Sequence, residues 1–352
     1  MAQLDKLLKA CADKKCSDLH LAVGIPVMVR LLGEIEPLTN HAATLEQVTT
    51  LIHEILPAEQ REQLIKQWEL DSIYLSADGE RFRMNVCKEQ RGLAAVFRHI
   101  PKRIRTFSEL GLPPVMEKFC LATQGLIIVT GPCRSGKSTT MASMLDWINT
   151  NRNEHIITIE DPIEYMHQNK KSIVSQRSVG PHTCSFANAL RAALREDPDV
   201  ILIGEIRDLE TMSLALTAAE TGHVVLTTLH TSSAPATINR VINLYPAAEQ
   251  AQAQTTLAEC LLGIVSQQLI KNAGGTDLVA AFEVLVNTMA VSNIIRSGEN
   301  FKLEGVMQVG AKEGMKLMET SLEELLKAGG ITAEARKEYS LKESKEAREA
   351  KA

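Results

Sequence analysis

The sequence predicts an α/β protein in which a mostly parallel sheet, covered by helices, follows a smaller α+β domain. From about residue 113 onward, short apolar runs alternate with stretches of helical periodicity, which is typical of such a sheet. Before residue 100, short strand patterns are mixed with amphipathic helices and show no such alternation. The chain has 352 residues, which is enough for two domains with a sizeable core.

Composition places the chain among ordinary globular proteins. It is 45% hydrophobic and 23% charged, and no apolar run reaches the length of a membrane span. The net charge of −5 provides no basic field that would attract nucleic acid or anionic lipid. Seven cysteines include no C-x-x-C pair, which argues against a structural zinc site and a disulfide framework. The first residues lack the apolar core of a signal peptide, so we expect a cytoplasmic protein. From the negative net charge we expect that the protein binds no nucleic acid.

Residues 1–100 are expected to form the smaller domain. Apolar periodicity predicts helices over 3–14, 45–55 and 58–68, and strands over 17–21, 27–31, 71–75, 81–87 and 93–97, the last three as a meander. A basic segment from Arg98 to Arg105 leads into a linker predicted over 101–112. This segment is either a solvated linker or a cationic strip beside a bound triphosphate or an acidic neighbouring subunit.

The larger domain is predicted over residues 113–340. Buried strands are expected over 126–129, 155–159, 200–204 and 223–228, with helices over 137–149, 186–195 and 208–221 between them. The last third is expected to be mainly helical, with helices over 247–268, 289–296, 314–327 and 332–339 and one strand over 278–285. The charged tail over 341–352 is low in apolar residues and is predicted to be disordered or at most a surface helix.

The stretch GLIIVTGPCRSGKS, from Gly125 to Ser138, carries the most specific motif of the chain. An apolar strand, a glycine-rich loop and a helix start form the context that makes G-x-x-x-x-G-K-[ST] a phosphate-binding P-loop. The backbone N–H groups of such a loop and the helix N-terminus point at one anion. Lys137 can reach the β- and γ-phosphates, and the Ser138 hydroxyl suits a Mg²⁺ ligand. The predicted nucleotide-binding residues are Gly131, Pro132, Cys133, Arg134, Ser135, Gly136, Lys137, Ser138 and Thr139.

Two acidic clusters follow two other predicted strands, at the ends where α/β proteins place ligands. Glu205 follows the strand over 200–204, as an acidic residue after a Walker-B-type strand would, and could hold Mg²⁺ directly or through water. Glu160, Asp161 and Glu164 follow the strand over 155–159 and could polarise the attacking water. A lone glutamate is usually a solvated loop residue, but two clusters in one P-loop domain favour the functional interpretation.

Histidines and arginines supply further candidates. His223 opens a strand and His230 ends it. A neutral imidazole at a strand end can sense a γ-phosphate by donating one hydrogen bond and accepting another, although a structural role is equally compatible with the sequence. Arg83 and Arg98 belong to a cluster of arginines in the first domain. They are either surface residues or donors that stabilise transition-state charge in trans.

Several longer segments extend these observations over nearly the whole chain. The first domain contains CSDLHL (16–21), RFRMN (81–85) and VFRHIP (96–101), and the P-loop is followed by ITIEDPIEY (157–165), ALREDPDVILIGEIRD (193–208) and TAAETGHVVLTTLHT (217–231). In this order and spacing they resemble the motifs of secretion ATPases of the type IV pilus and type II secretion class, and within it those of the PilT retraction ATPases. The last three segments correspond to that family's Asp box, Walker B region and His box.

The resemblance implies a hexameric, RecA-like ATPase that uses ATP and Mg²⁺ and carries a PAS-like first domain packed on the adjacent subunit. Such a motor drives pilus retraction at the cytoplasmic face of the inner membrane, through a PilC-like platform protein and in the company of PilU-like or PilB-like ATPases. Glu164 matches the family's catalytic glutamate and Glu205 its Walker B glutamate. His223 and His230 match its His-box histidines. The resemblance also places Arg83 and Arg98 near the nucleotide.

Two departures from the family pattern leave alternatives open. Cys133 and Arg134 replace Thr and Gly of the usual GPTGSGKS loop, and the retraction motif AIRNLIR has become AVSNIIR over 290–296. The alternatives are an accessory PilU-like paralogue, an assembly or type II secretion ATPase, a nucleic-acid motor and a regulator that binds nucleotide without hydrolysing it. The lack of a tetracysteine zinc motif weighs against an assembly ATPase, and the acidic charge against a nucleic-acid motor.

Overall fold

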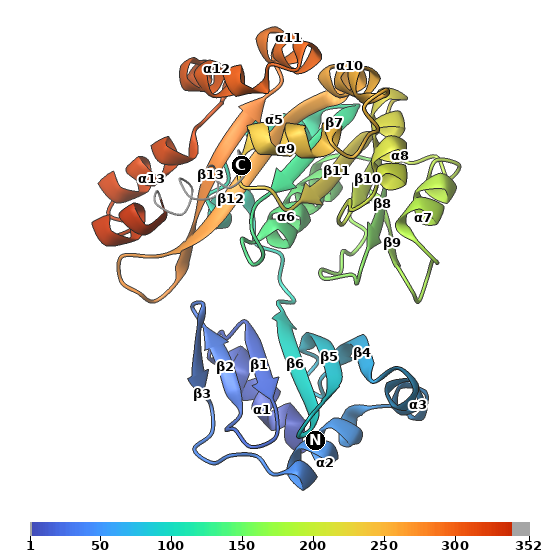
Figure 1. Ribbon diagram of the computed structural model, residues 1–352, viewed down its shortest axis with the longest axis vertical. Coiled ribbons are helices and arrows are strands. Elements are labelled where there is room, and N and C mark those ends of the chain that lie inside the picture. The colour runs from blue at the N-terminus through green and yellow to red at the C-terminus, as the bar shows by residue number, and fades with distance from the viewer. Residues whose placement is uncertain (1, 340–352) are drawn as a thin grey trace. The chain divides into compact units, whose positions relative to one another are not determined.

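The structure is a computed structural model that describes residues 2–339. The charged tail predicted over 341–352 lies outside the described residues. The chain divides into two compact units with a boundary between Arg103 and Ile104, inside the segment predicted as a linker (Figure 1). Among the described residues, no helix has the length and apolar content needed to cross a bilayer.

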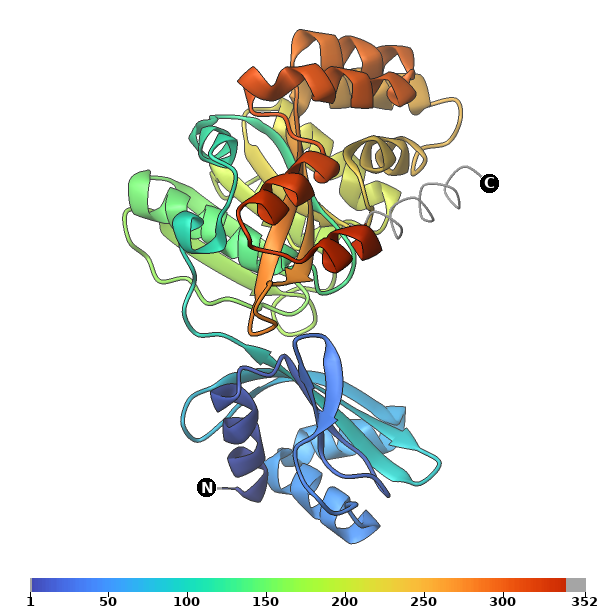
Figure 2. The same cartoon turned by 90° about the vertical axis from the view of Figure 1, so that its left-hand side faces the viewer.

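The first unit is a six-stranded antiparallel sheet with three helices packed on one face (Figure 2). Leu19, Phe82 and Phe97 point from the sheet toward these helices and are fully buried. The predicted meander is confirmed as β4–β5–β6, whereas β3 was not predicted because its EIEP sequence is an exposed edge strand without apolar alternation. The elements are α1 (Gln3–Asp13), β1 (Asp18–Leu21), β2 (Met28–Leu31), β3 (Glu34–Pro37), α2 (Leu45–Ile55), α3 (Ala58–Gln67), β4 (Glu69–Leu75), β5 (Arg81–Glu89) and β6 (Gly92–Ile100), in sheet order β3-β2-β1-β6-β5-β4.

The second unit is built on a seven-stranded sheet in the order β13-β12-β7-β11-β10-β8-β9. All neighbouring strands are parallel except the β12–β13 pair, so the predicted mostly parallel sheet is confirmed. Its strands are β7 (Gly125–Thr130), β8 (His155–Glu160), β9 (Ile173–Ser178), β10 (Val200–Ile203), β11 (Val224–Leu229), β12 (Leu261–Lys271) and β13 (Leu278–Val286).

Helices cover both faces of this sheet (Figure 1). Alternate residues of the interior strand β7 enter two separate apolar cores, with Leu126 and Ile128 in one and Ile127 and Val129 in the other. All six residues of β7 are buried, so the loop that follows starts from a rigid strand. The helices are α4 (Phe107–Leu110), α5 (Val115–Leu121), α6 (Lys137–Asn151), α7 (Phe186–Ala193), α8 (Leu209–Glu220), α9 (Ala234–Ile242), α10 (Gln250–Cys260), α11 (Met289–Ser297), α12 (Leu303–Val309) and α13 (Met318–Lys327), with short 3₁₀ turns at Asn300–Lys302 and Gly310–Glu313.

The helix predicted over 247–268 is wrong in its second half. Helix α10 ends at Cys260 and the chain continues as β12, the longest strand of the sheet. Residues 261–270 are nearly all buried, and a strand covered on both faces shows the same continuous apolar run as a buried helix. Gly263 marks the strand, because a Cβ there would lie 2.4 Å from the Phe119 ring and 2.7 Å from the Leu285 carbonyl oxygen. The helix predicted over 314–327 likewise starts only at Met318.

A buried carboxylate on β13 ties two helix starts to the sheet. Glu283 is 8% exposed, and it accepts hydrogen bonds from the backbone N–H of Ala234, at 2.7 Å, and of Met318. These residues begin α9 and α13, whose first N–H groups lack partners within the helix. Burial raises the pKa of Glu283 to about 7.

This carboxylate predicts a pH dependence of stability. Since the folded chain holds the Glu283 proton more tightly than the unfolded chain does, the free energy of unfolding should fall as pH rises from 4.5 to about 7. The slope should be at most about 1.4 kcal/mol per pH unit. Urea unfolding curves across this window should show the slope in the wild type and lose it in Glu283→Gln. The exposed Glu117→Gln is the control, and an equal slope in all three proteins would contradict the prediction.

Candidate nucleotide-binding site

The loop between β7 and α6 has a backbone that only glycine can adopt at its two ends. Gly131 has a φ of +142° and Gly136 a φ of +88°, both in the region that side chains rarely occupy. A Cβ on Gly131 would lie 2.3 Å from the Gln267 carbonyl oxygen. Helix α6 starts directly after Gly136, so its unbonded N–H groups face the loop. The loop therefore has the backbone geometry that a phosphate-binding cradle requires.

Arg134 also occupies a left-handed conformation, with a φ of +67°. The resembling family has glycine at this position, and the backbone angle gives the reason. A non-glycine residue in this region is disfavoured by about 1–2 kcal/mol. The side chains of Cys133 and Arg134 are exposed, so neither fills the loop.

Lys137 lies inside the loop rather than extending into solvent. Its Nζ donates to the carbonyl oxygens of Gly131 and Pro132, both at 2.9 Å, and the residue is 8% exposed. Burial lowers the pKa of the ammonium group, and this effect is opposed by Cys133 and by the carboxylates of Glu205 and Glu164. The structure thus brings both predicted glutamates within electrostatic reach of Lys137.

His230 connects Lys137 to Glu205. The Lys137 ammonium lies 3.3 Å from His230 Nδ1, and His230 Nε2 lies 3.2 Å from Glu205 Oε1. An ammonium group can only donate, so Nδ1 accepts, and the proton of a neutral ring then sits on Nε2, the nitrogen that faces Glu205. Burial alone would raise the pKa of Glu205, but Arg207, at 2.7 Å, and then His230 and Lys137 lower it. The outcome is an ionised carboxylate connected to the loop lysine through one imidazole.

Threonine side chains hold these strand ends in place. The Thr228 hydroxyl on β11 donates to the Gly204 carbonyl oxygen at the end of β10, next to Glu205. The Thr130 hydroxyl at the end of β7 lies 2.7 Å from the Thr231 hydroxyl and accepts from the Thr231 N–H at 2.9 Å. His230 is therefore fixed against both neighbouring strands.

The segment that carries Glu164 is anchored by groups that the sequence did not single out. Tyr165 is buried and its hydroxyl lies 2.8 Å from the Thr139 hydroxyl at the start of α6. Gln176 on β9 donates to the Tyr165 carbonyl oxygen at 2.9 Å and to Glu160 at 3.2 Å. Burial raises the pKa of Glu160, which also accepts from the Glu164 N–H at 3.4 Å. Glu160 thus supports the segment instead of facing the loop, and Glu164 is the half-buried carboxylate of this cluster.

Gln267 on β12 clamps the loop and was hidden in the segment predicted as a helix. The residue is 1% exposed. Its Nε2 donates to the Ser135 carbonyl oxygen, and its Oε1 accepts from the Thr140 hydroxyl at 2.7 Å. One amide thereby joins the loop to the first turn of α6.

Gln267→Ala is predicted to raise the KM for ATP about tenfold, because loss of two buried hydrogen bonds loosens the loop before nucleotide is bound. Bound phosphates would restore the loop, so kcat should change less than about threefold. Steady-state phosphate release over a range of ATP concentrations measures both constants. Gln268→Ala is the control, since this buried neighbour points to the opposite face of the strand. A fall in kcat with unchanged KM would contradict the prediction.

The structure does not bring His223 to this edge of the sheet. His223 lies before the first residue of β11 and His230 after its last, and a strand rises about 3.3 Å per residue, so the two are about 23 Å apart. His223 Nδ1 is 2.9 Å from the Ala218 carbonyl oxygen at the end of α8. Its predicted catalytic part stays a prediction.

Arg83 and Arg98 are neighbours on the helix-free face of the first unit's sheet. They are paired across β5 and β6, and Arg98 is paired in turn with Asp18 on β1. Arg83 contacts Asp71 at 2.7 Å, and Arg98 donates to the fully buried Asp18 at 2.9 Å. The two guanidinium groups are thus held in a fixed row, and their predicted part near a nucleotide remains untested.

The chemistry of the loop fits a nucleotide with Mg²⁺. Ser135 is 2% exposed and its hydroxyl has no hydrogen-bond partner among residues 2–339, which suits a phosphate oxygen. Ser138 at the start of α6 and the ionised Glu205 offer the hard oxygen donors that Mg²⁺ prefers. The described part of the chain holds no cluster of three or more His, Cys, Asp or Glu side chains arranged for a metal.

Comparison with known proteins gives a consistent result. Residues 46–337 match the family model described as type II/IV secretion system protein. The type IV pilus retraction ATPase PilT of Pseudomonas aeruginosa is 44% identical over 335 residues, covering 95% of this chain and 97% of the relative. The type IV pilus ATPase PilU of the same organism is 37% identical over 332 residues, covering 94% and 87%. A crystal structure of the pilus retraction motor PilT with bound ADP superposes with a TM-score of 0.85 at 43% identity, over 96% of this chain and 97% of that one. The predicted fold class, a RecA-like ATPase domain after a smaller α+β domain, is confirmed.

Proposed function

The chain belongs to the type II/IV secretion system protein family, and from this membership we propose that it is an ATP-hydrolysing motor that drives type IV pilus retraction. The observation that carries the proposal is the connection from Lys137 through His230 to Glu205 beside the P-loop. The relative named as a pilus retraction ATPase and the crystal structure with bound ADP each match nearly the whole chain.

Each group at the loop has a part in the proposed hydrolysis. Lys137 and the loop N–H groups bind the β- and γ-phosphates of ATP. Ser138 and Glu205 would hold Mg²⁺, which neutralises charge on the transferring phosphate when it is bound. Glu164 orients and polarises the attacking water. A hydrogen bond from a ring N–H of His230 to the γ-phosphate would let the end of β11 register whether ATP or ADP is bound.

The assembly is proposed on family grounds. We propose a cytoplasmic homo-hexamer at the inner membrane, in which the first domain packs on the adjacent subunit. Arg83 and Arg98 would then stabilise transition-state charge in trans, which couples hydrolysis to rotation of the domains. Force would pass to a PilC-like platform protein, and PilU-like or PilB-like ATPases would act with the motor.

A second candidate, an accessory PilU-like paralogue, is favoured by one contact. The family's retraction motif has arginine where this chain has Ser292 on α11. The Ser292 hydroxyl donates to the Ala258 carbonyl oxygen and lies 3.0 Å from Asn287 Oδ1. The side chain is thus tied to the end of α10 and presents no cation, whereas Val291 keeps the buried apolar position of the motif.

Deletion of the gene in its host, with complementation by wild type or by Glu164→Gln, tests the proposal. Persistent surface pili that fail to shorten, rescued only by the wild type, are the expected result. Loss of pili would show an assembly motor instead. Unchanged retraction would favour the accessory role, and Ser292→Arg would then be the first variant to examine.

A further inference from the structure

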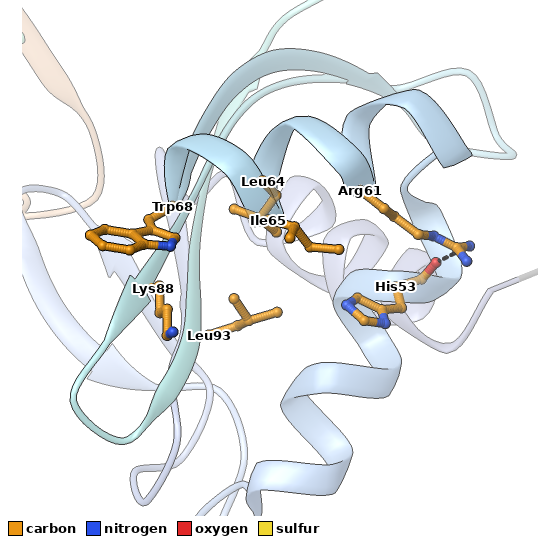
Figure 3. Close-up of a pocket in the computed structure, with 7 residues that line it drawn as sticks. All are labelled: His53, Arg61, Leu64, Ile65, Trp68, Lys88 and Leu93. Atoms are coloured by element: carbon orange, nitrogen blue, oxygen red, sulfur yellow. Dashed lines mark hydrogen bonds between the residues drawn. The ribbon is translucent and has the colours of Figure 1, made fainter.

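A pocket on the first unit, remote in sequence from every P-loop residue, combines an apolar floor with two cations. It has a volume of about 180 Å³ and lies between α3, the end of α2 and the β5–β6 hairpin (Figure 3). Leu64 and Leu93 form the floor, and Ile65 lies on the rim. A cavity of roughly 150 Å³ takes one benzene ring, so this pocket fits one aromatic or branched aliphatic side chain.

Trp68 borders the pocket in a conformation that folding alone does not favour. It ends α3 with a φ of +64°, where helices usually place glycine or asparagine. The residue is 65% exposed, and Ile65 on the preceding turn is 74% exposed. An exposed indole next to an exposed isoleucine on the rim of a hollow is the arrangement of a protein-binding surface, where tryptophan is a preferred anchor.

The charges of the pocket select the partner. Arg61 and Lys88 stand at opposite ends of the apolar floor (Figure 3). Arg61 donates to the carbonyl oxygens of His53 and Leu56, and Lys88 lies 5.7 Å from the Trp68 ring. Within residues 2–339 neither cation has a carboxylate partner, and the pocket is lined by no acidic residue. Two unpaired cations that flank an apolar hollow complement an apolar side chain with carboxylates on both sides.

We propose that this pocket docks a short acidic segment of a partner protein, in which an apolar side chain fills the hollow and flanking carboxylates contact Arg61 and Lys88. A peptide can place single carboxylates on these two cations. The concave shape also favours a side chain over a membrane surface.

The fluorescence of Trp68 reports on occupancy directly. The chain has two tryptophans, so the full-length Trp147→Phe protein leaves Trp68 as the single reporter. The probe is the peptide acetyl-Gly-Glu-Asp-Leu-Phe-Glu-Asp-Gly-amide. It should change Trp68 emission saturably, and the affinity should fall as salt is raised. Two control peptides, one with amides for the carboxylates and one with serine for the Leu-Phe pair, should each bind at least about tenfold more weakly.

Matched variants separate an effect on docking from an effect on folding. Peptide binding to Trp68→Gly, which lacks the fluorescent reporter, is measured by calorimetry. Trp68→Gly suits the left-handed backbone, so its Tm should stay the same or rise while peptide binding is lost. Lys88→Gln removes no structural hydrogen bond and should weaken binding about tenfold. ATP hydrolysis should be unchanged in both, which keeps this test independent of the proposed motor function.

Several results would overturn the proposal. Emission that does not respond to millimolar peptide, equal binding of the amide control, or full binding by Trp68→Gly would each do so. A signal that depends on protein concentration without peptide would show a second copy of the chain as the occupant. Binding to phosphatidylglycerol vesicles that needs Trp68 and exceeds peptide binding would show a membrane contact instead.

Discussion

Glu164→Gln is expected to leave ATP binding intact and to slow hydrolysis by a factor on the order of 10² to 10⁴. This is the rate enhancement that a positioned general base contributes. The side chain is half-buried and acts electrostatically on Lys137, so it stands close to the place where the phosphates would lie if this lysine binds them. Glutamine preserves its size but cannot accept a proton from water. Single-turnover hydrolysis with labelled ATP measures the chemical step, and a fluorescent ATP analogue measures affinity.

The neighbouring Asp161→Asn is the control for this variant. Asp161 is an exposed carboxylate of the same segment, so its neutralisation changes the local charge equally while leaving Glu164 in place. Its hydrolysis rate should stay within about threefold of the wild type. Wild-type turnover in Glu164→Gln would remove this residue from the catalytic role, and an equal loss in both variants would show that the segment acts only through its charge.

The P-loop could be predicted from the sequence because its requirements are local. Gly131, Gly136 and Lys137 lie within seven residues of each other, and the strand before them and the helix after them are strongly patterned. The carboxyl ends of parallel strands meet at one edge of the sheet, so Glu205 and His230 could also be placed beside the loop without coordinates. The distance of 3.2 Å between His230 Nε2 and Glu205 Oε1 agrees with that topological argument.

The supporting contacts could not be predicted, because they join distant segments. Gln267 binds the carbonyl oxygen of a residue 132 positions earlier, and it lies in a run whose buried apolar residues suit a helix as well as a strand. Tyr165 and Gln176 likewise act through tertiary contacts. The pair of glutamines at 267 and 268, inside a long apolar run, could have indicated a supporting contact, because buried side-chain amides need hydrogen-bond partners. For His223, by contrast, the sequence was sufficient to show a large distance from the loop, because the length of β11 separates it from His230.

Lys137→Ala is expected to weaken ATP binding by a factor on the order of 10² to 10³ and to remove hydrolysis. The loop already removes most water from the ammonium group in the absence of nucleotide. Binding ATP therefore does not require the loss of a full hydration shell, which would otherwise offset the attraction between the ammonium group and phosphate. Its loss also leaves the carbonyl oxygens of Gly131 and Pro132 without their donor at the point where phosphate would lie. Isothermal titration with the non-hydrolysable analogue AMP-PNP measures the affinity.

Stability separates this loss of binding from unfolding. Burial lowers the pKa of Lys137, so the cost of desolvating its charge offsets the two hydrogen bonds that it donates, and its removal should change the Tm of the nucleotide-free protein little. The exposed Lys118→Ala, on α5, controls for the loss of one positive charge and should bind ATP like the wild type. The wild type should gain Tm when ATP is added, whereas Lys137→Ala should not. Undiminished affinity in Lys137→Ala would mean that the loop N–H groups alone hold the phosphates, and the connection through His230 to Glu205 would then lose its role in sensing them.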